Sequence, residues 1–238
     1  MKHLKKIFET KPKSEYVHEM FDKLAVDYDL MNNIISFGRH KFVKKHVIKN
    51  VPIRYGMNIL DVCTGTGDIP LFIAKKFGNS VKIIGVDFSE KMLEIARKRN
   101  DKYDNAEFIN ADALNLPFED KSFDVVFISF GLRNLADLRK GIIELQRVTK
   151  KGGYVVNLDM GKPKGIAGCM FRLYFYWLVP LLGKLFHGSS EPYVYLPESC
   201  ESFPAQEELV RIFYELGFDD VKNYNFAFGA LAQQIAKV

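Results

Sequence analysis

The sequence predicts an α/β fold in which a mostly parallel sheet carries helices on both faces. Short, continuously apolar segments alternate with segments of helical periodicity over residues 57–160, which is the order that produces βαβ units. The apolar segments lack a polar face, as strands buried on both sides do. Two strand-like segments close the chain after residue 217. A pair of this kind predicts an antiparallel edge.

The first 50 residues predict a helical cap outside the sheet. Ser14 is a predicted N-cap, and the apolar positions after it have the i, i+3, i+4, i+7, i+8 spacing of an amphipathic helix: Val17, Met20, Phe21, Leu24 and Ala25. Residues 38–50 predict a second, basic helix. Residues 1–56 hold 12 Lys and Arg against 6 Asp and Glu. This excess favours a solvated helical face, with nucleic acid or an anionic membrane as alternative partners.

The remaining elements follow in order. Strands are predicted at 57–63, 81–87, 106–110, 123–130 and 154–160. The intervening helices run to Phe77, from Ser89 to Asn100 and from Asp137 to Lys150, with Ser89 and Asp137 as N-caps. A turn at 150–153 leads into the fifth strand, and a helix at 204–216 precedes the final strand pair.

Length and cysteine content set the compartment that we expect. The 238 residues suit one large domain with a full core. Cys63, Cys169 and Cys200 form no C-x-x-C pair, so a reducing environment is expected. The charged N-terminus has no apolar core and is not expected to be a signal peptide. A cytoplasmic protein is therefore predicted.

A glycine-rich turn follows the first predicted strand in "LDVCTGTGDIP", residues 60–70. Such a turn lets a ligand approach the backbone at a helix N-terminus. Dinucleotide sites use G-x-G-x-x-G, but here Gly65 and Gly67 are followed by Pro70. Asp68 would repel a pyrophosphate, whereas it suits a ligand with an ammonium and a sulfonium group. S-adenosylmethionine carries both groups.

Two further acids lie where an adenosyl ligand needs them. Asp87 ends the second predicted strand and can accept hydrogen bonds from ribose hydroxyls. Asp112 follows the third strand and can face the exocyclic amine of adenine. The alternative is that both acids only cap helices and turns. All three acids fall on the ligand edge of a parallel sheet, and this favours the cofactor site.

Three motifs resemble the ubiquinone/menaquinone biosynthesis C-methyltransferase family, within the class I S-adenosylmethionine-dependent methyltransferases. They are "YDLMNNIISFGRHKF" at 28–42, "FGLRN" at 130–134 and "YLPESCESFP" at 195–204. The resemblance implies a Rossmann-like fold with a seven-stranded sheet and one antiparallel edge strand. Five positions depart from the family pattern: Val43 for Trp, Lys151 for Pro, Asp159 for Glu, Gly161 for Ser and Gln234 for His.

The expected cofactor site combines the turn with what the resemblance implies. It comprises Asp61, Gly65, Thr66, Gly67, Asp87, Phe88, Asp112, Ala113 and Ser129. Of these, Thr66 and Ser129 rest mainly on the resemblance. Residues 51–238 are thus expected to be an S-adenosylmethionine-binding methyltransferase domain, with a hydrophobic insert at about 160–203 that faces substrate or membrane. Residues 1–50 are expected to form the cap and substrate region.

The resemblance implies C-methylation of a polyprenylated quinol. Demethylmenaquinol in menaquinone biosynthesis is favoured, and a 2-methoxy-6-polyprenyl-benzoquinol of ubiquinone biosynthesis is the alternative. Arg133 is the candidate for stabilising a phenolate, since arginine stays protonated, and Asn134 for bonding the second ring oxygen. Asp68, Tyr195 and His40 are candidate bases. No metal is expected, because no Cys/His/Asp cluster has ligand spacing.

The segment 166–186 is the most hydrophobic part of the chain, with no charge between Arg172 and Lys184. It is too short to span a bilayer. It is expected to contact the substrate tail or the inner face of the plasma membrane, with Tyr174, Tyr176 and Trp177 at the interface. The alternative is plain packing, in the core or in a homodimer.

Three other functions are alternatives. An NAD(P)-dependent oxidoreductase is disfavoured by the missing third glycine and by Asp68. An RNA methyltransferase is suggested by the basic N-terminus. However, amino-methylating enzymes of nucleic acids carry [N/D]-P-P-[Y/F] after the fourth strand, whereas this chain has "SFGLRN"; no nucleic-acid partner is expected. A non-catalytic protein on the same fold is disfavoured by the intact acids.

Overall fold

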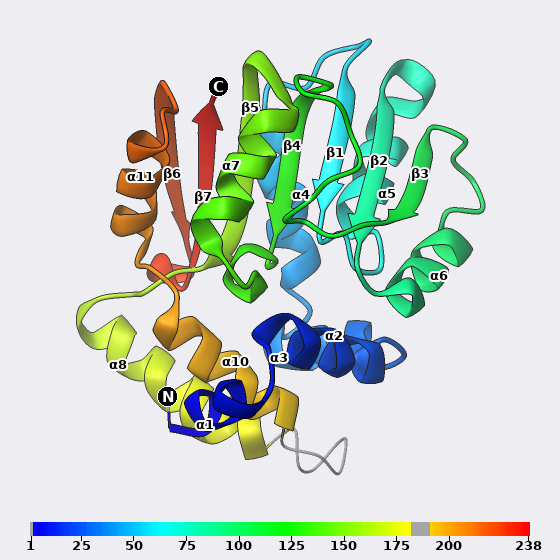
Figure 1. Ribbon diagram of the computed structural model, residues 1–238. Helices are drawn as coiled ribbons and strands as arrows, with labels where there is room; N and C mark the ends of the chain where they lie inside the picture. Colours follow the sequence, from blue (N-terminus) through cyan, green and yellow to red (C-terminus); the bar gives the residue numbers. More distant parts are fainter. Residues whose placement is uncertain (1, 182–190) are drawn as a thin grey trace.

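A seven-stranded sheet forms the centre of the computed structural model, which describes residues 2–181 and 191–238 (Figure 1). The strand order is β3-β2-β1-β4-β5-β7-β6. The bounds are β1 Asn58–Val62, β2 Lys82–Asp87, β3 Ala106–Asn110, β4 Phe123–Ser129, β5 Thr149–Met160, β6 Asp220–Phe226 and β7 Leu231–Lys237. The first five strands are parallel, and β7 runs antiparallel to both neighbours. The predicted sheet and its antiparallel edge are confirmed.

Helices bury both faces of the sheet. On one face lie α4 (His40–Lys49) and α5 (Asp68–Phe77), and on the other α7 (Leu138–Val148) and α11 (Gln206–Glu215). Successive residues of β1 serve both cores, because side chains alternate along a strand. Ile59 packs in the cluster of α4 and α5, whereas Leu60 packs in the cluster of α7 and α11. Helix α6 (Glu90–Arg99) packs against β3 and β2.

A cap of helices covers the carboxyl ends of the parallel strands (Figure 1). It combines α1 (Lys2–Thr10), α2 (Lys13–Leu24) and α3 (Tyr28–Ser36) with α8 (Gly165–Leu173) and α10 (Glu191–Ser202) from the later part of the chain. The cap has its own apolar cluster, built from both segments: Tyr16, Val17, Met20, Leu24, Val179, Tyr193 and Tyr195. Parts of the predicted N-terminal cap, residues 1–50, and of the predicted insert at about 160–203 therefore pack together.

Local corrections concern the element boundaries. Helix α2 begins at Lys13 after Pro12, so Ser14 lies inside its first turn and is not the N-cap. Ser89 and Asp137 are N-caps as predicted, each accepting a backbone N–H. The predicted turn at 150–153 is part of β5, which starts at Thr149 and has a register shift against β4. Helix α10 was not predicted, since it contains Pro197.

The hydrophobic segment has two different faces over residues 165–181. After α8, the chain continues in a π-helical turn, Tyr174–Leu178. Phe175 and Val179 are buried toward the cap, whereas the opposite side is exposed: Ile166, Met170, Leu173, Trp177 and Leu181. We call these five residues the apolar stripe. Lys184 lies outside the described residues. None of the described helices is both long and apolar enough to cross a membrane.

Candidate active site

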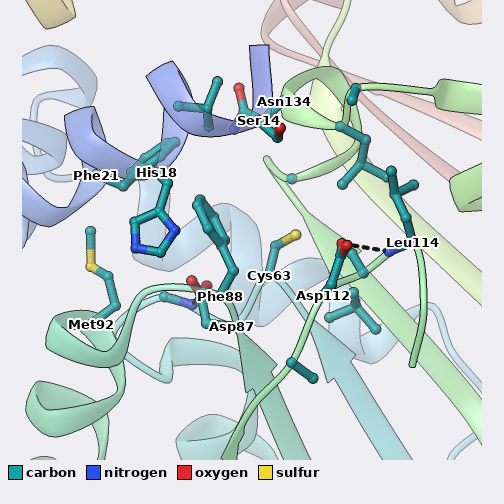
Figure 2. Close-up of a pocket in the computed structure, with 18 of the residues that line it drawn as sticks. Ser14, His18, Phe21, Cys63, Asp87, Phe88, Met92, Asp112, Leu114 and Asn134 are labelled. Atoms are coloured by element: carbon teal, nitrogen blue, oxygen red, sulfur yellow. Dashed lines mark hydrogen bonds between the residues drawn. The ribbon is translucent and has the colours of Figure 1, made fainter. Parts of the chain in front are cut away.

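A cavity of about 670 Å³ lies between α2 and the carboxyl ends of β1, β2, β3 and β4 (Figure 2). Six of the expected cofactor residues line it: Gly65, Asp87, Phe88, Asp112, Ala113 and Ser129. The cap closes the other side with residues of α2 and α3. Parallel strands end at one edge of a sheet, and this explains why residues distant in sequence meet there.

The glycine turn has the backbone conformation that its composition predicts. Gly65 and Gly67 have φ values of 56° and 84°, a region that favours glycine. A Cβ on Gly67 would also stand 3.0 Å from the Phe108 ring. The Gly65 N–H donates to Oδ2 of Asp87 at 2.8 Å, tying the turn to the end of β2. The loop backbone can thus approach a ligand closely while Asp87 holds its shape.

Asp87 is a buried carboxylate at the cavity wall. Its Oδ1 accepts the Ser89 N–H at 3.0 Å, in addition to the Gly65 bond at Oδ2. Burial raises the pKa of Asp87 to about 6, although these backbone N–H groups favour the ionised form. Each carboxylate oxygen can accept a second bond. Asp87 can therefore receive ligand hydroxyls without losing its contacts to the turn.

Asp61 and Ser129 supply buried polar atoms that have no hydrogen-bond partner among the described residues. Oδ2 of Asp61 accepts the Thr64 hydroxyl at 2.6 Å, but its Oδ1 accepts nothing. Burial raises the pKa of Asp61 to about 7. Ser129 Oγ is equally unpartnered and lies on the cavity wall. Unsatisfied buried groups are costly in a folded protein, so Ser129, which lines the cavity, fits a site that a polar ligand completes. Asp61 is not among the residues that line the cavity.

Asp112 lies at the far side of the cavity, after β3. Its Oδ1 accepts the Leu114 N–H at 2.9 Å, which fixes the turn and leaves the second oxygen for a ligand (Figure 2). Ala113 lines the cavity beside it. Asp112 thus caps a turn, as the alternative expected, and it also lines the cavity.

Thr66 and Asp68 are not among the residues that line the cavity. Both belong to a network of charged and polar side chains. Thr66 donates to Asp29 of α3 at 2.9 Å. The carboxylate of Asp68 binds Lys44 Nζ at 3.0 Å and Arg99 at 2.7 Å. Although burial opposes ionisation, these two cations hold the pKa of Asp68 well below its usual value. The expected base role of Asp68 is therefore corrected, since both oxygens are occupied and proton affinity is low.

The other two candidate bases, Tyr195 and His40, are also not among the described residues that line the cavity. Tyr195 is 3% exposed and donates its hydroxyl to Asn134 Oδ1 at 2.9 Å. Burial raises the pKa of Tyr195 well above its usual value. His40 bonds Ser36 through Nδ1 at 2.9 Å, and burial and then Lys44 lower the pKa of its imidazole. These contacts indicate positioning rather than proton transfer.

Arg133 and Asn134 are neighbours in sequence but lie in different environments, since only Asn134 lines the cavity. Asn134 lines the cavity, and its Nδ2 donates to Phe130 O at 3.0 Å. Arg133 is not among the cavity-lining residues. Its Nη1 donates to Asp159 Oδ1 and to Phe130 O, both at 2.8 Å. The guanidinium does not line the cavity, so direct contact with a phenolate is corrected to a buried ion pair behind the loop.

Several wall residues come from α2 and were not assigned to the site from the sequence. Val17 and Phe21 were predicted as the apolar helix face, and they line the cavity. His18 was given no role, yet its ring meets Phe88 edge-on with centroids 4.8 Å apart (Figure 2). Helical spacing could have grouped His18 with Phe21. What it could not show is that this face closes over the sheet.

The fold and this site define a class of protein. A solved S-adenosylmethionine-dependent methyltransferase from Thermotoga maritima matches with a TM-score of 0.65 at 20% identity, covering 92% of this chain and 98% of that chain. One from Aquifex aeolicus gives a TM-score of 0.63 at 20% identity, with 87% and 95% covered. At such identities the likeness shows the fold.

The chain belongs to the ubiE/COQ5 methyltransferase family, whose sequence model matches residues 9–237. Two relatives from Staphylococcus aureus, in strains MRSA252 and Newman, are demethylmenaquinone methyltransferases. Both are 42% identical to this chain over 228 residues, which is 95% of each chain. The protein is an S-adenosylmethionine-dependent methyltransferase, and the family assignment made from the three motifs is confirmed.

Proposed function

We propose that this protein methylates a ring carbon of demethylmenaquinol, or of a naphthoquinol like it, in menaquinone biosynthesis. One observation supports it most: a single cavity has carboxylates at the strand ends, Asp87 and Asp112, and the cap adds apolar and aromatic side chains, Val17, Phe21 and Tyr28, beside the polar Ser14, Glu15, His18 and Glu19. The first set suits an adenosyl cosubstrate and the second an aromatic ring. The name of the 42% identical relatives supports the same substrate.

The cosubstrate would supply an electrophilic methyl group on a sulfonium when bound. Gly65, Asp87, Phe88, Asp112 and Ser129 would hold it along the strand edge. The protein's task is then to place a ring carbon in line with that methyl group, because positioning supplies much of the rate. As the new carbon–carbon bond forms and the carbon–sulfur bond breaks, the quinol loses a proton.

The proton must leave a phenol, whose reference pKa is about 10. Among the histidines whose side chains the structure describes, His18 lines the cavity, and its imidazole is the candidate to accept this proton. Asn134 can orient a ring oxygen at the opposite wall. The buried pair of Arg133 and Asp159 supports the loop that carries Asn134. Arg133 thus acts on the reaction through the loop.

The apolar stripe supports contact with a lipid surface or with the isoprenoid tail. Trp177 is 75% exposed and Ile166 83% exposed, and a lipid-soluble substrate must leave a membrane to reach the cavity. Arg172 lies between stripe residues, where its charge can reach the headgroups. Tyr174 is not free for this role, because its hydroxyl donates to Ile35 O at 2.6 Å.

An anaerobic assay with labelled S-adenosylmethionine tests the substrate. Demethylmenaquinol and a benzoquinol with the same short tail are compared as acceptors. Label in the naphthoquinol alone is expected, because relatives 42% identical to this chain are named demethylmenaquinone methyltransferases. Label in the benzoquinol alone would assign the enzyme to ubiquinone synthesis, and label in neither would reject a quinol substrate.

The single tryptophan of the chain makes the stripe directly observable. Trp177 emission should shift to the blue when vesicles with anionic lipids are added, since an exposed indole moves into an apolar layer. Trp177→Glu should abolish co-flotation with vesicles, and Tyr55→Glu, at an exposed aromatic before β1, should not. A concentration-dependent doubling of mass without vesicle binding would assign the stripe to a homodimer instead.

A further inference from the structure

Lys13 joins the cap to the loop that carries Asn134. Its Nζ donates to Arg133 O at 2.9 Å and to Leu135 O at 2.7 Å, the carbonyls on either side of Asn134. These carbonyls lie at the end of a short 3-10 turn, Leu132–Asn134, where backbone acceptors lack helical partners. Lysine is a strong multiple donor for such a site.

The surroundings of the Lys13 ammonium oppose its positive charge. It is half-buried beside the pair of Arg133 and Asp159, and burial followed by the Arg133 charge lowers its pKa. An ordinary surface lysine would stay in water. The two charge-assisted bonds to the carbonyls therefore offset the cost of desolvation and of repulsion by Arg133, and they hold the Lys13 ammonium in this position.

The two ends of α2 are anchored on opposite sides of the cavity. At its start, Lys13 binds the loop after β4. Near its end, Asp22 accepts the hydroxyl of Ser89 at 2.6 Å, at the start of α6. The residues between these anchors, including Val17 and His18, line the cavity. The first anchor lies at Asn134, whereas the second lies beside Asp87 on the cofactor side.

We propose that Lys13 is a positioning residue for the acceptor ring: it fixes the start of α2 against the Asn134 loop and so sets the width of the acceptor half of the cavity. This role rests on the proposed methyl transfer to a quinol. Gly65, Asp87 and Asp112 lie on the other strand ends, so the cofactor half keeps its own contacts when Lys13 is lost.

The test compares Lys13→Met, Lys13→Arg and the control Lys11→Met in the anaerobic assay. Lys11 is the matched control, because it lies two residues before Lys13 and its ion pairs with Glu19 and Glu15 of α2 do not involve the Asn134 loop. Lys13→Met should lower kcat about tenfold or more and raise KM for the quinol, since small misplacements cost large factors in rate. Its Kd for S-adenosylhomocysteine, measured by calorimetry, should stay within about twofold of wild type.

Arginine at position 13 can donate to two carbonyls, so Lys13→Arg should recover most of the lost activity, and Lys11→Met should behave as wild type. Equal loss of quinol and S-adenosylhomocysteine binding in Lys13→Met would overturn the proposal, because a general loosening of the cavity would then explain it. An arginine variant no better than the methionine variant would overturn it as well.

Wild-type turnover separates this inference from the proposed function. If wild type methylates neither quinol, the substrate assignment fails, and amide exchange then judges Lys13 independently. Exchange should rise in residues 13–18 and 131–136 in Lys13→Met but not in Lys11→Met. Unchanged exchange in both segments would refute the link between α2 and the Asn134 loop.

Discussion

At the residue scale, Arg133 and Asp159 show how burial changes the meaning of a charge. Their side chains are 8% and 1% exposed, and Asp159 Oδ2 also accepts the Arg133 backbone N–H at 3.2 Å. Removing one partner of a buried pair leaves an uncompensated charge. The pair therefore matters most for the integrity of the loop that carries Asn134.

Arg133→Ala should lower the free energy of unfolding by about 3–5 kcal/mol, because Asp159 would be buried alone. Arg139→Ala is the control, since Arg139 and Glu215 form an exposed pair, and such pairs contribute at most about 1 kcal/mol. Urea unfolding of the three proteins measures both effects. Equal stabilities of the two variants would show that the buried pair is not structural.

Asp61 makes stability depend on pH. Its folded pKa of about 7 lies above the ordinary value of 3.8 for an aspartate, so its favourable contribution to stability is complete below about pH 4 and is lost as pH rises through 7. Asp61→Asn removes this titration and can keep the Thr64 bond. Relative to wild type, the variant should gain up to about 3 kcal/mol between pH 5 and pH 8. Urea titrations at both pH values measure the gain, and a pH-independent difference would contradict the assignment.

At the element scale, the helix caps link local sequence to the site. Ser89 accepts the Met92 N–H at 3.3 Å as the N-cap of α6, and its own hydroxyl donates to Asp22 of α2. Asp137 caps α7 by accepting the Lys140 N–H at 3.0 Å. Both residues are N-caps, but Ser89 also binds α2, the helix that covers the cavity.

Ser89→Ala and Asp137→Ala should each cost about 1 kcal/mol of stability, which is typical for the loss of an N-cap. Only Ser89→Ala should also raise amide exchange in α2 and weaken S-adenosylhomocysteine binding, because α2 loses its anchor beside Asp87. Exchange mass spectrometry and calorimetry distinguish the two. Identical exchange in α2 would mean that the Asp22 contact carries no weight.

At the scale of the whole molecule, a charge network joins α3, α4 and α6 to the glycine turn. Lys44 of α4 and Arg99 of α6 bind the two oxygens of Asp68, while Asp29 of α3 accepts the Thr66 hydroxyl. Three separate segments thus converge on one short turn. The conformation of the glycine turn therefore depends on contacts with segments that lie between Asp29 and Arg99 in the sequence.

Lys44→Met and Asp68→Asn should therefore couple. Lys44→Met should cost about 2 kcal/mol, since Arg99 still pairs with Asp68, and the double variant should lose roughly 1–3 kcal/mol less than the sum of the single losses. Urea unfolding of the four proteins completes the cycle. Strict additivity would show that the two groups do not share an interaction.

Local sequence determined much of this protein. Alternating apolar segments predicted β1 to β5, Ser89 and Asp137 predicted their caps, and three motifs identified the family. These features were predictable because strand burial, capping and glycine turns depend on neighbours within a few residues. Gly65, Asp87 and Asp112 line one cavity for a similarly local reason, since parallel strands end at a common edge.

Tertiary structure alone decided which candidate residues face the cavity. Asp68 and Arg133 were expected at the chemistry, but Lys44 and Asp159 neutralise them in the interior. Lys13 belongs to no local pattern, and helical spacing indicates only that His18 shares a helix face with Phe21. The docking of α2 brings Lys13 to the Asn134 loop and His18 to Phe88. A side chain's partners across the fold depend on long-range packing, and no periodicity within its own segment encodes that packing.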